Sequence, residues 1–98
     1  MDNPLLAIVG TVTIVGPVVL GPNDTTYPYL VIRDQRGEPR GFNETSARPG
    51  VSQLVEPHTT GLFVFKHTRE ETRLLCVVCE DGRQAVDFKA LRGVVGGK

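Results

Sequence analysis

The amino-acid sequence predicts an all-β fold, a small antiparallel barrel of five to six strands. Short segments rich in β-branched and aromatic residues recur about every ten residues, and turns rich in Gly and Pro separate them. Apolar and polar residues alternate along several of these segments, which is typical of half-buried strands. The sequence has no heptad pattern, internal repeat or long amphipathic helix that would favour another class.

Residues 7–15 are expected to form the first strand, because β-branched side chains alternate between its two faces. Gly10 interrupts this alternation, as glycines do at bulges and at the bent corners of small barrels. Residues 18–20 are expected to continue this strand after a bend at Gly16 and Pro17, and further strands are expected at residues 27–34, 38–43, 61–67, 73–80 and 83–88. Gly- and Pro-containing turns separate most of these segments.

The dipeptide Asp81-Gly82 stands between two apolar runs and predicts a hairpin with a two-residue type I′ turn. This turn would place Val77 opposite Val86 and Leu75 opposite Phe88. These four apolar side chains would then share the core-facing side of the hairpin. Phe63 and Phe65 are expected in the same core.

Residues 44–60 contain prolines and glycines and are expected to form an irregular crossover with a brief helical turn near residues 52–55. Residues 93–98 are expected to be a flexible tail. A long bent first strand, a meander, a crossover and a final hairpin together resemble the architecture of an OB-like barrel. An SH3-like barrel is the near alternative.

The 98 residues are enough for one domain with one modest core, spanning residues 1–98. Eleven basic residues balance eleven acidic residues, so the formal net charge is zero. Nucleic-acid binders gain affinity by neutralising phosphates, so any such site here must be local. The composition argues against a disordered chain and a multi-pass membrane protein.

The apolar stretch at residues 5–20 is preceded by Asp2 and not by a basic segment, unlike a signal peptide. Its glycines, threonines and Pro17 make it a poor membrane helix. Two cysteines are too few for a disulfide scaffold. We therefore expect a cytoplasmic protein that does not act at a membrane.

The sequence Cys76-Val-Val-Cys79 raises the question of a metal or redox site. On a strand, positions three apart point to opposite faces, so the two sulfurs would not share one ion. His58 and His67 do not complete a usual zinc spacing. The sequence also contains no nucleophile elbow, phosphate-binding glycine loop or metalloprotease motif. We expect a protein that is not an enzyme and uses no metal or cofactor.

The strand at residues 73–80 is apolar on both faces. Leu74, Cys76 and Val78 would lie on the outer face, as would Val9 and Val15 beside the threonines of the first strand. A single-layer barrel has only one interior, so apolar residues on its exterior need cover from another molecule. We therefore expect protein–protein assembly, with a partner protein or a second copy of the chain.

The alternative function is binding of single-stranded nucleic acid. Aromatic rings beside arginines on an exposed sheet can stack bases and hold phosphates. In OB-like barrels the second and third strands are the usual binding face. The residues expected for this face are Tyr27, Tyr29, Arg33, Arg36, Arg40 and Phe42. A barrel that binds a carbohydrate or peptide is a third option, for which the sequence favours no ligand.

Overall fold

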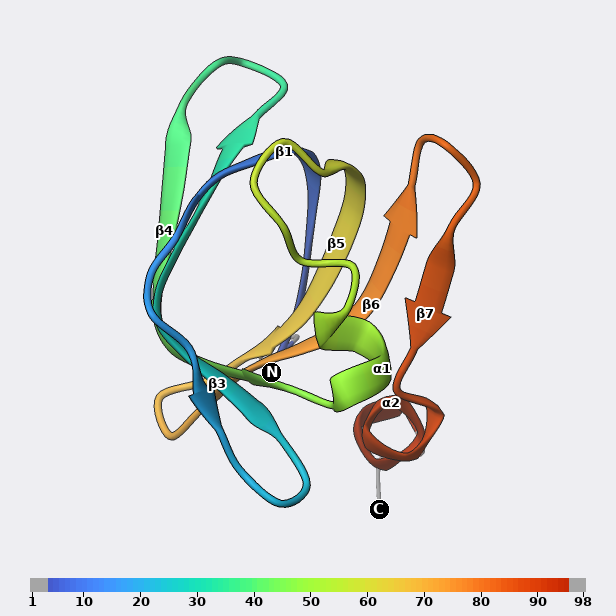
Figure 1. Ribbon diagram of the computed structural model, residues 1–98. Coiled ribbons are helices and arrows are strands. Elements are labelled where there is room, and N and C mark those ends of the chain that lie inside the picture. The colour runs from blue at the N-terminus through green and yellow to red at the C-terminus, as the bar shows by residue number, and fades with distance from the viewer. Residues whose placement is uncertain (1–3, 96–98) are drawn as a thin grey trace.

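Strands dominate the computed structural model, which describes residues 4–95 (Figure 1). The strands are β1 (Leu5–Val15), β2 (Val19–Leu20), β3 (Thr25–Asp34), β4 (Pro39–Ala47), β5 (Thr60–His67), β6 (Thr72–Cys79) and β7 (Gln84–Val86). The helices are α1 (Pro49–Ser52) and α2 (Phe88–Val95). The prediction of a mostly β fold is confirmed, and each expected strand has a counterpart. Residues 19–20 form the separate strand β2 and do not continue β1 as expected.

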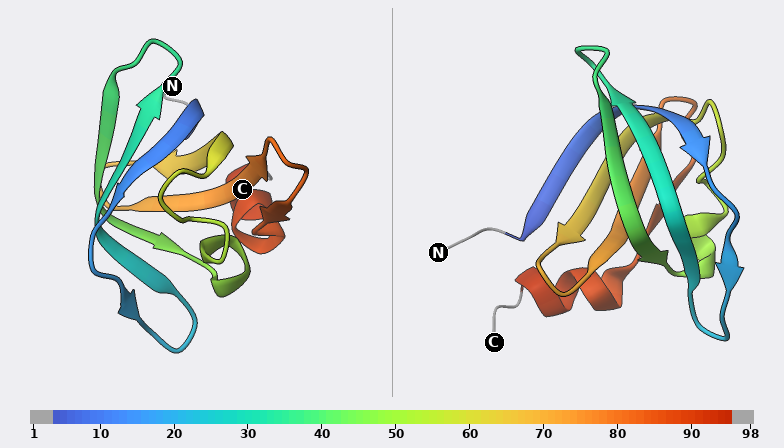
Figure 2. Two further views of the ribbon diagram at one scale, coloured as in Figure 1. Left: turned by 45° about the horizontal axis from the view of Figure 1, so that its top comes forward. Right: turned by 90° about the vertical axis from the view of Figure 1, so that its left-hand side faces the viewer.

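Five of the strands pair in a ring, in the order β1–β5–β6–β4–β3 and back to β1. Four of these pairings are antiparallel, whereas β4 pairs with β6 in parallel. Parallel neighbours need a crossover connection, and the chain between them includes α1 and β5. Two short strands are not members of the ring. Strand β2 pairs with β3, and strand β7 pairs with β6 (Figure 2).

Strand β1 contributes to the ring twice. Its residues 5–11 pair with β5, and its residues 10–15 pair with β3. Gly10 lies where the two pairings overlap, opposite Gly61 of β5. The register with β3 shifts between Val12 and Ile14, so the expected irregularity of the first strand takes the form of a bulge beside Thr13.

The core fills the ring. Phe42 of β4 stacks on Phe65 of β5 with ring centroids 4.3 Å apart, and Phe63 is fully buried beside them. The predicted burial of Phe63 and Phe65 is therefore confirmed. The other buried residues of this cluster are Ile8, Val12, Tyr27, Leu30, Ile32, Ala47, Val51, Val55, Leu74, Val77 and Cys79.

The expectation that Leu74 faces outward is wrong. The pairing of β6 with β5 joins Cys76 to Val64 and Leu74 to Phe65, so Leu75 is an extra residue in β6. Such a bulge reverses the alternation of side chains beyond it. Leu74 therefore packs in the core, fully buried. Leu75 is also buried but lies outside that cluster, and its carbonyl accepts a hydrogen bond from the Asp87 amide (2.7 Å) at the start of α2.

The final hairpin has a three-residue loop and not the predicted two-residue turn. The Cys79 amide donates to the Arg83 carbonyl (2.7 Å), and Gly82 takes a φ of 99°. A loop of this kind places its glycine in the left-handed region. The Asp81 carboxylate supports it by accepting bonds from the Arg83 amide and side chain, at 3.1 and 2.9 Å.

The longer loop moves the register of the hairpin by one residue. Val86 now lies opposite Cys76, and Ala85 lies opposite Val77. The prediction that Val86 and Phe88 face the core is therefore wrong. Val86 points to the outside of the ring, and Phe88 begins α2 with 67% of its surface exposed.

The crossover is more regular than expected. Strand β4 continues to Ala47, and α1 begins at Pro49, earlier than the turn predicted at residues 52–55. Part of the expected flexible tail belongs to α2, which runs to Val95. Residues 96–98 of that tail lie outside the described residues. Among residues 4–95 no helix is long and apolar enough to span a membrane.

Candidate interaction surface

An apolar patch covers the outside of four neighbouring strands. Residues directly opposite each other in paired strands lie on the same face of the sheet. The register therefore builds one row from Ala7, Val64, Cys76 and Val86, and a second row from Val9, Leu62 and Val78. We call these seven residues the outer wall. At usual strand spacing the four strands extend about 14 Å across the sheet.

The outer wall contains no charged residue, and its members are partly or largely exposed. Val9 has 43% of its surface exposed. Polar residues border the patch, because Thr11 and Thr60 continue the second row's strands at one end and Lys66 lies beyond Val64 at the other. An apolar centre with a polar rim is the usual composition of a protein–protein contact.

Three of the five residues predicted for partner binding lie on the outer wall, namely Val9, Cys76 and Val78. Leu74 does not, because the bulge turns it into the core. Val15 lies at the far end of β1, beyond the bulge at Thr13, and packs half-buried against the core. The four members of the outer wall that the sequence did not predict are Ala7, Leu62, Val64 and Val86. Two of these, Leu62 and Val64, belong to the strand that the sequence predicted at residues 61–67.

The predicted nucleic-acid face is divided between the inside and the outside of the ring. Tyr27 is 2% exposed and Phe42 is 5% exposed, so neither is available for stacking. The pairing joins Tyr27 to Thr45 and Tyr29 to Asn43, and Glu44 between them has a φ of 50°. The alternation of inward and outward side chains along β3 shifts by one residue at this point, because the next inward-facing residue after Tyr27 is Leu30. Tyr27 therefore faces the core, whereas Tyr29 faces outward.

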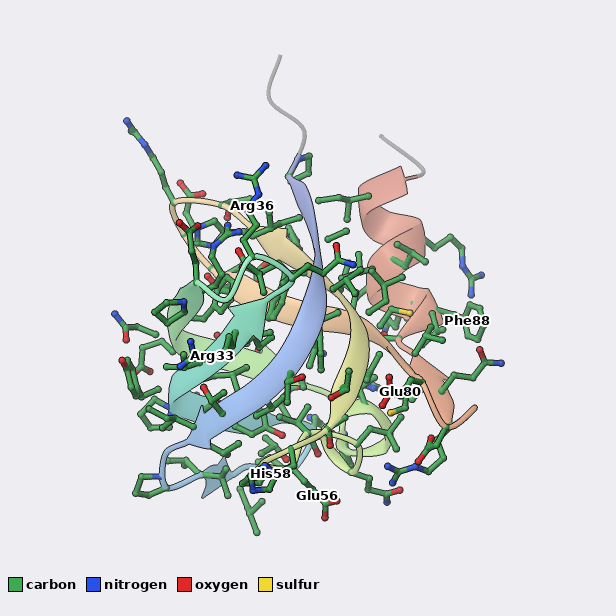
Figure 3. All side chains as sticks on the ribbon, turned by 90° about the horizontal axis from the view of Figure 1, so that it is seen from above. Arg33, Arg36, Glu56, His58, Glu80 and Phe88 are labelled. Atoms are coloured by element: carbon green, nitrogen blue, oxygen red, sulfur yellow. The ribbon has the colours of Figure 1, made fainter. Side chains whose placement is uncertain are left out.

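Tyr29 remains outside with 47% of its surface exposed, and Arg33 and Arg36 are exposed as well. Arg33 Nη1 donates to the Gly37 carbonyl (2.7 Å), and Arg40 lies 3.8 Å from the Asp34 carboxylate. Part of the local positive charge is therefore already engaged. Figure 3 shows Arg33 and Arg36 on the β3–β4 side, away from Phe88 at the start of α2.

Arg73 links β6 to three other parts of the chain through its guanidinium group. Its Nη2 donates to Asp24 (2.9 Å) and to Asp87 (3.1 Å), and its Nη1 donates to Ser46 (3.1 Å). Hydrogen bonding to Arg73 lowers the pKa of Asp24, and the same contact with Asp24 raises the pKa of Arg73. Asp87 also caps α2, because its carboxylate accepts a bond from the Ala90 amide (3.1 Å).

The two cysteines lie on opposite sides of the sheet. Cys79 belongs to the core and Cys76 to the outer wall, and burial raises the pKa of both thiols. Both are free cysteines, with no disulfide between them. No cluster of three or more His, Cys, Asp or Glu residues within residues 4–95 is arranged to hold a metal ion.

The chain matches no known family model, no curated protein and no solved structure. Its function is therefore inferred from the geometry described above.

Proposed function

We propose that this protein is a non-catalytic assembly module whose contact surface is the outer wall. The observation that carries the proposal is the register itself, which aligns seven apolar side chains in two rows over four strands. The core does not need these residues, because a separate cluster fills the inside of the ring. Covering such a surface gains free energy from burial of apolar area.

A second copy of the same chain is the partner that fits this surface. A surface that meets its own copy about a two-fold axis uses the same patch on both chains, and residues near the axis meet their own counterparts. Charged residues would then repel each other, whereas an uncharged apolar patch is complementary to itself. The outer wall is uncharged throughout, and the chain has a net charge of zero.

Sedimentation velocity over a wide range of protein concentration tests this proposal. The wild-type chain should form a dimer as concentration rises. Val78→Lys should remain a monomer, because it places two like charges in a desolvated contact. Val19→Lys is the matched control. Val19 is 59% exposed on β2, away from the outer wall, so this variant should dimerise like the wild type.

A wild-type chain that stays monomeric at its highest soluble concentration would overturn self-assembly. Equal loss of dimer in the Val78→Lys and Val19→Lys variants would reject the outer wall as the contact. Circular dichroism of each variant checks that the fold is retained.

We also propose that the strand ring is an OB-like barrel, that is, a five-stranded and partly open Greek-key barrel. Support comes from the long β1 that pairs at both of its ends, the β3–β4 meander, the crossover with α1 and the β5–β6 hairpin. An SH3-like barrel remains the alternative. Neither assignment is needed for the outer wall.

Single-stranded nucleic acid is a second candidate ligand, and exposed Tyr29 is the observation that favours it. Gly41 lies beside this ring. A Cβ at position 41 would contact the ring at 3.9 Å, so the absence of a side chain there leaves the ring more open. Anisotropy of a labelled oligothymidine at low salt provides the test. Tyr29→Ala should weaken binding several-fold and Val19→Ala should not, because stacking contributes about 1–3 kcal/mol per base. Absence of binding at low salt would remove this candidate.

A further inference from the structure

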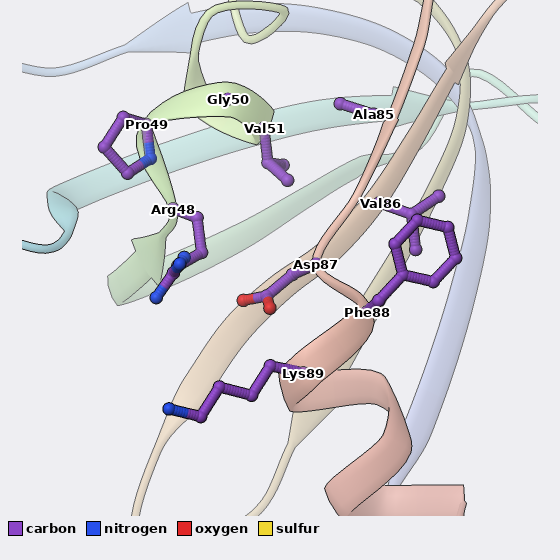
Figure 4. A pocket seen from close by; sticks show the side chains of 9 residues that line it. All are labelled: Arg48, Pro49, Gly50, Val51, Ala85, Val86, Asp87, Phe88 and Lys89. Atoms are coloured by element: carbon purple, nitrogen blue, oxygen red, sulfur yellow. The ribbon is translucent and has the colours of Figure 1, made fainter.

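A second site lies between α1 and the segment that joins β7 to α2. A pocket of about 440 Å³ opens there, which is within the size range of small-ligand sites. Figure 4 shows that its lining comes from two distant parts of the chain, residues 48–51 and residues 85–89. A smaller adjoining pocket shares Arg48, Asp87 and Lys89 with it.

The lining is apolar at one end and cationic at the other. Val51, Val86 and Phe88 provide apolar surface, and Phe88 is far more exposed than a large aromatic side chain usually is. Arg48 and Lys89 provide the positive charge. Within the part of the chain that the structure describes, neither of these two cations makes a close ion pair or a side-chain hydrogen bond. Arg48 interacts with Asp24 only through its charge, which helps to lower the pKa of that carboxyl.

The charge around the pocket defines the ligand that would balance it. Asp87 lines the pocket, but both of its carboxylate oxygens are engaged, by Arg73 and by the Ala90 amide. Arg73 is in turn shared with Asp24. The local set therefore contains three cations and two carboxylates, an excess of one positive charge.

The geometry points to a binding site for a monoanionic carboxylate carried on an apolar or aromatic body. The carboxylate would bind Arg48 and Lys89, because a guanidinium group matches the planar geometry of a carboxylate. The apolar body would lie against Val86 and Phe88. Either a free aromatic acid or the C-terminal residue of a peptide has this chemistry. The argument for this site does not rest on the proposed assembly, although Val86 belongs to both surfaces.

The test titrates the ¹⁵N-labelled chain with N-acetylphenylalanine and, separately, with its amide. The Val78→Lys background prevents dimerisation from affecting the result. The acid should shift the amide signals of residues 48–51 and 85–89, and the uncharged amide should bind at least tenfold more weakly. Arg48→Gln and Lys89→Gln should each weaken binding of the acid about tenfold. Arg36→Gln, an exposed arginine on the β3–β4 side, should leave it unchanged.

Two further probes separate the sources of the carboxylate. Tighter binding of acetyl-Gly-Gly-Phe than of 3-phenylpropionate would support a peptide terminus, and the reverse would support a free acid. No shift with any of these acids, or equal binding of the acid and the amide, would overturn the proposal. Equal weakening by Arg36→Gln and Arg48→Gln would overturn it as well.

Discussion

Gly10 of β1 lies directly opposite Gly61 of β5, and each of the two glycines is also close to the backbone of another neighbouring strand. A Cβ on Gly10 would overlap the Arg33 carbonyl oxygen, and one on Gly61 would overlap the Val78 carbonyl oxygen. Neither oxygen can move without breaking strand pairing. Gly10 therefore allows β1 to approach β3 closely, and Gly61 allows β5 to approach β6 closely.

Substitution of Gly61 by alanine should destabilise the fold strongly for this reason. We expect Gly61→Ala to lower the free energy of unfolding by about 2–4 kcal/mol, as strained backbone contacts do. Urea denaturation measures the change. Gly50→Ala is the matched control. Gly50 lies in α1 with no atom within 4 Å of its Cβ position, so the control should unfold like the wild type or slightly later.

Thr45 has a fully buried side chain, and its hydroxyl has no hydrogen-bond partner among the described residues. Valine has nearly the same shape and no polar atom. We therefore expect Thr45→Val to raise the free energy of unfolding by about 1 kcal/mol. Thr72→Val should lower it instead, because the Thr72 hydroxyl is bonded to His67 Nδ1 (2.8 Å). In thermal unfolding, the melting temperature should rise for Thr45→Val and fall for Thr72→Val if the hydroxyls differ in this way.

The contact between Asp24 and Arg73 should make the free energy of unfolding depend on pH in the acidic range. Arg73 lowers the pKa of Asp24 below its ordinary value of 3.8, so the folded state favours the ionised carboxylate. This stabilisation is fully present above pH 3.8 and is lost as the pH falls through the lowered pKa. Asp24→Asn should therefore lose less stability than the wild type between about pH 5 and about pH 2.

Glu56→Gln is the control for the acid titration. Glu56 is exposed, and within residues 4–95 its side chain makes no ion pair. This variant should keep the wild-type pH dependence. Identical profiles for Asp24→Asn and the wild type would contradict the role given to Asp24.

Thiol reactivity reports on both sides of β6. Burial raises the pKa of Cys76 and Cys79, and only the thiolate reacts readily with a disulfide reagent. In the native Cys76→Ser variant, Cys79 should not react with dithionitrobenzoate. In the wild type, Cys76 should react more slowly as the protein concentration rises, because assembly covers the outer wall. A rate independent of concentration would contradict burial of Cys76 in a dimer.

The alternation of residue types predicted the strands well, because a strand with one buried face must alternate. It did not predict which face some residues occupy. Leu75, Gly82 and Glu44 each mark a place where the register or the side-chain alternation shifts by one residue. A shift of one residue moves every following side chain to the other face. Leu74, Val86 and Tyr27 are among the residues that lie on the other side from the one predicted.

The candidate surfaces were predictable to a similar extent. The excess of apolar residues at 74–78 was enough by itself to indicate an exposed apolar face. The pocket beside α2 could not be found in this way, because Arg48 and Lys89 are 41 positions apart in the sequence. Their proximity depends on the parallel pairing of β4 with β6, which no local pattern indicates.

Strand β2 is the exposed end of the paired strands, with Val19 and Leu20 at its surface. Open strand edges with apolar side chains can recruit further chains without limit and lead to fibres. Pro17 and Pro22 stand just outside this strand and have no amide hydrogen to donate. The exposed edge is therefore limited to two residues, which is too short to template a fibre. Assembly with a partner can then take place at the outer wall.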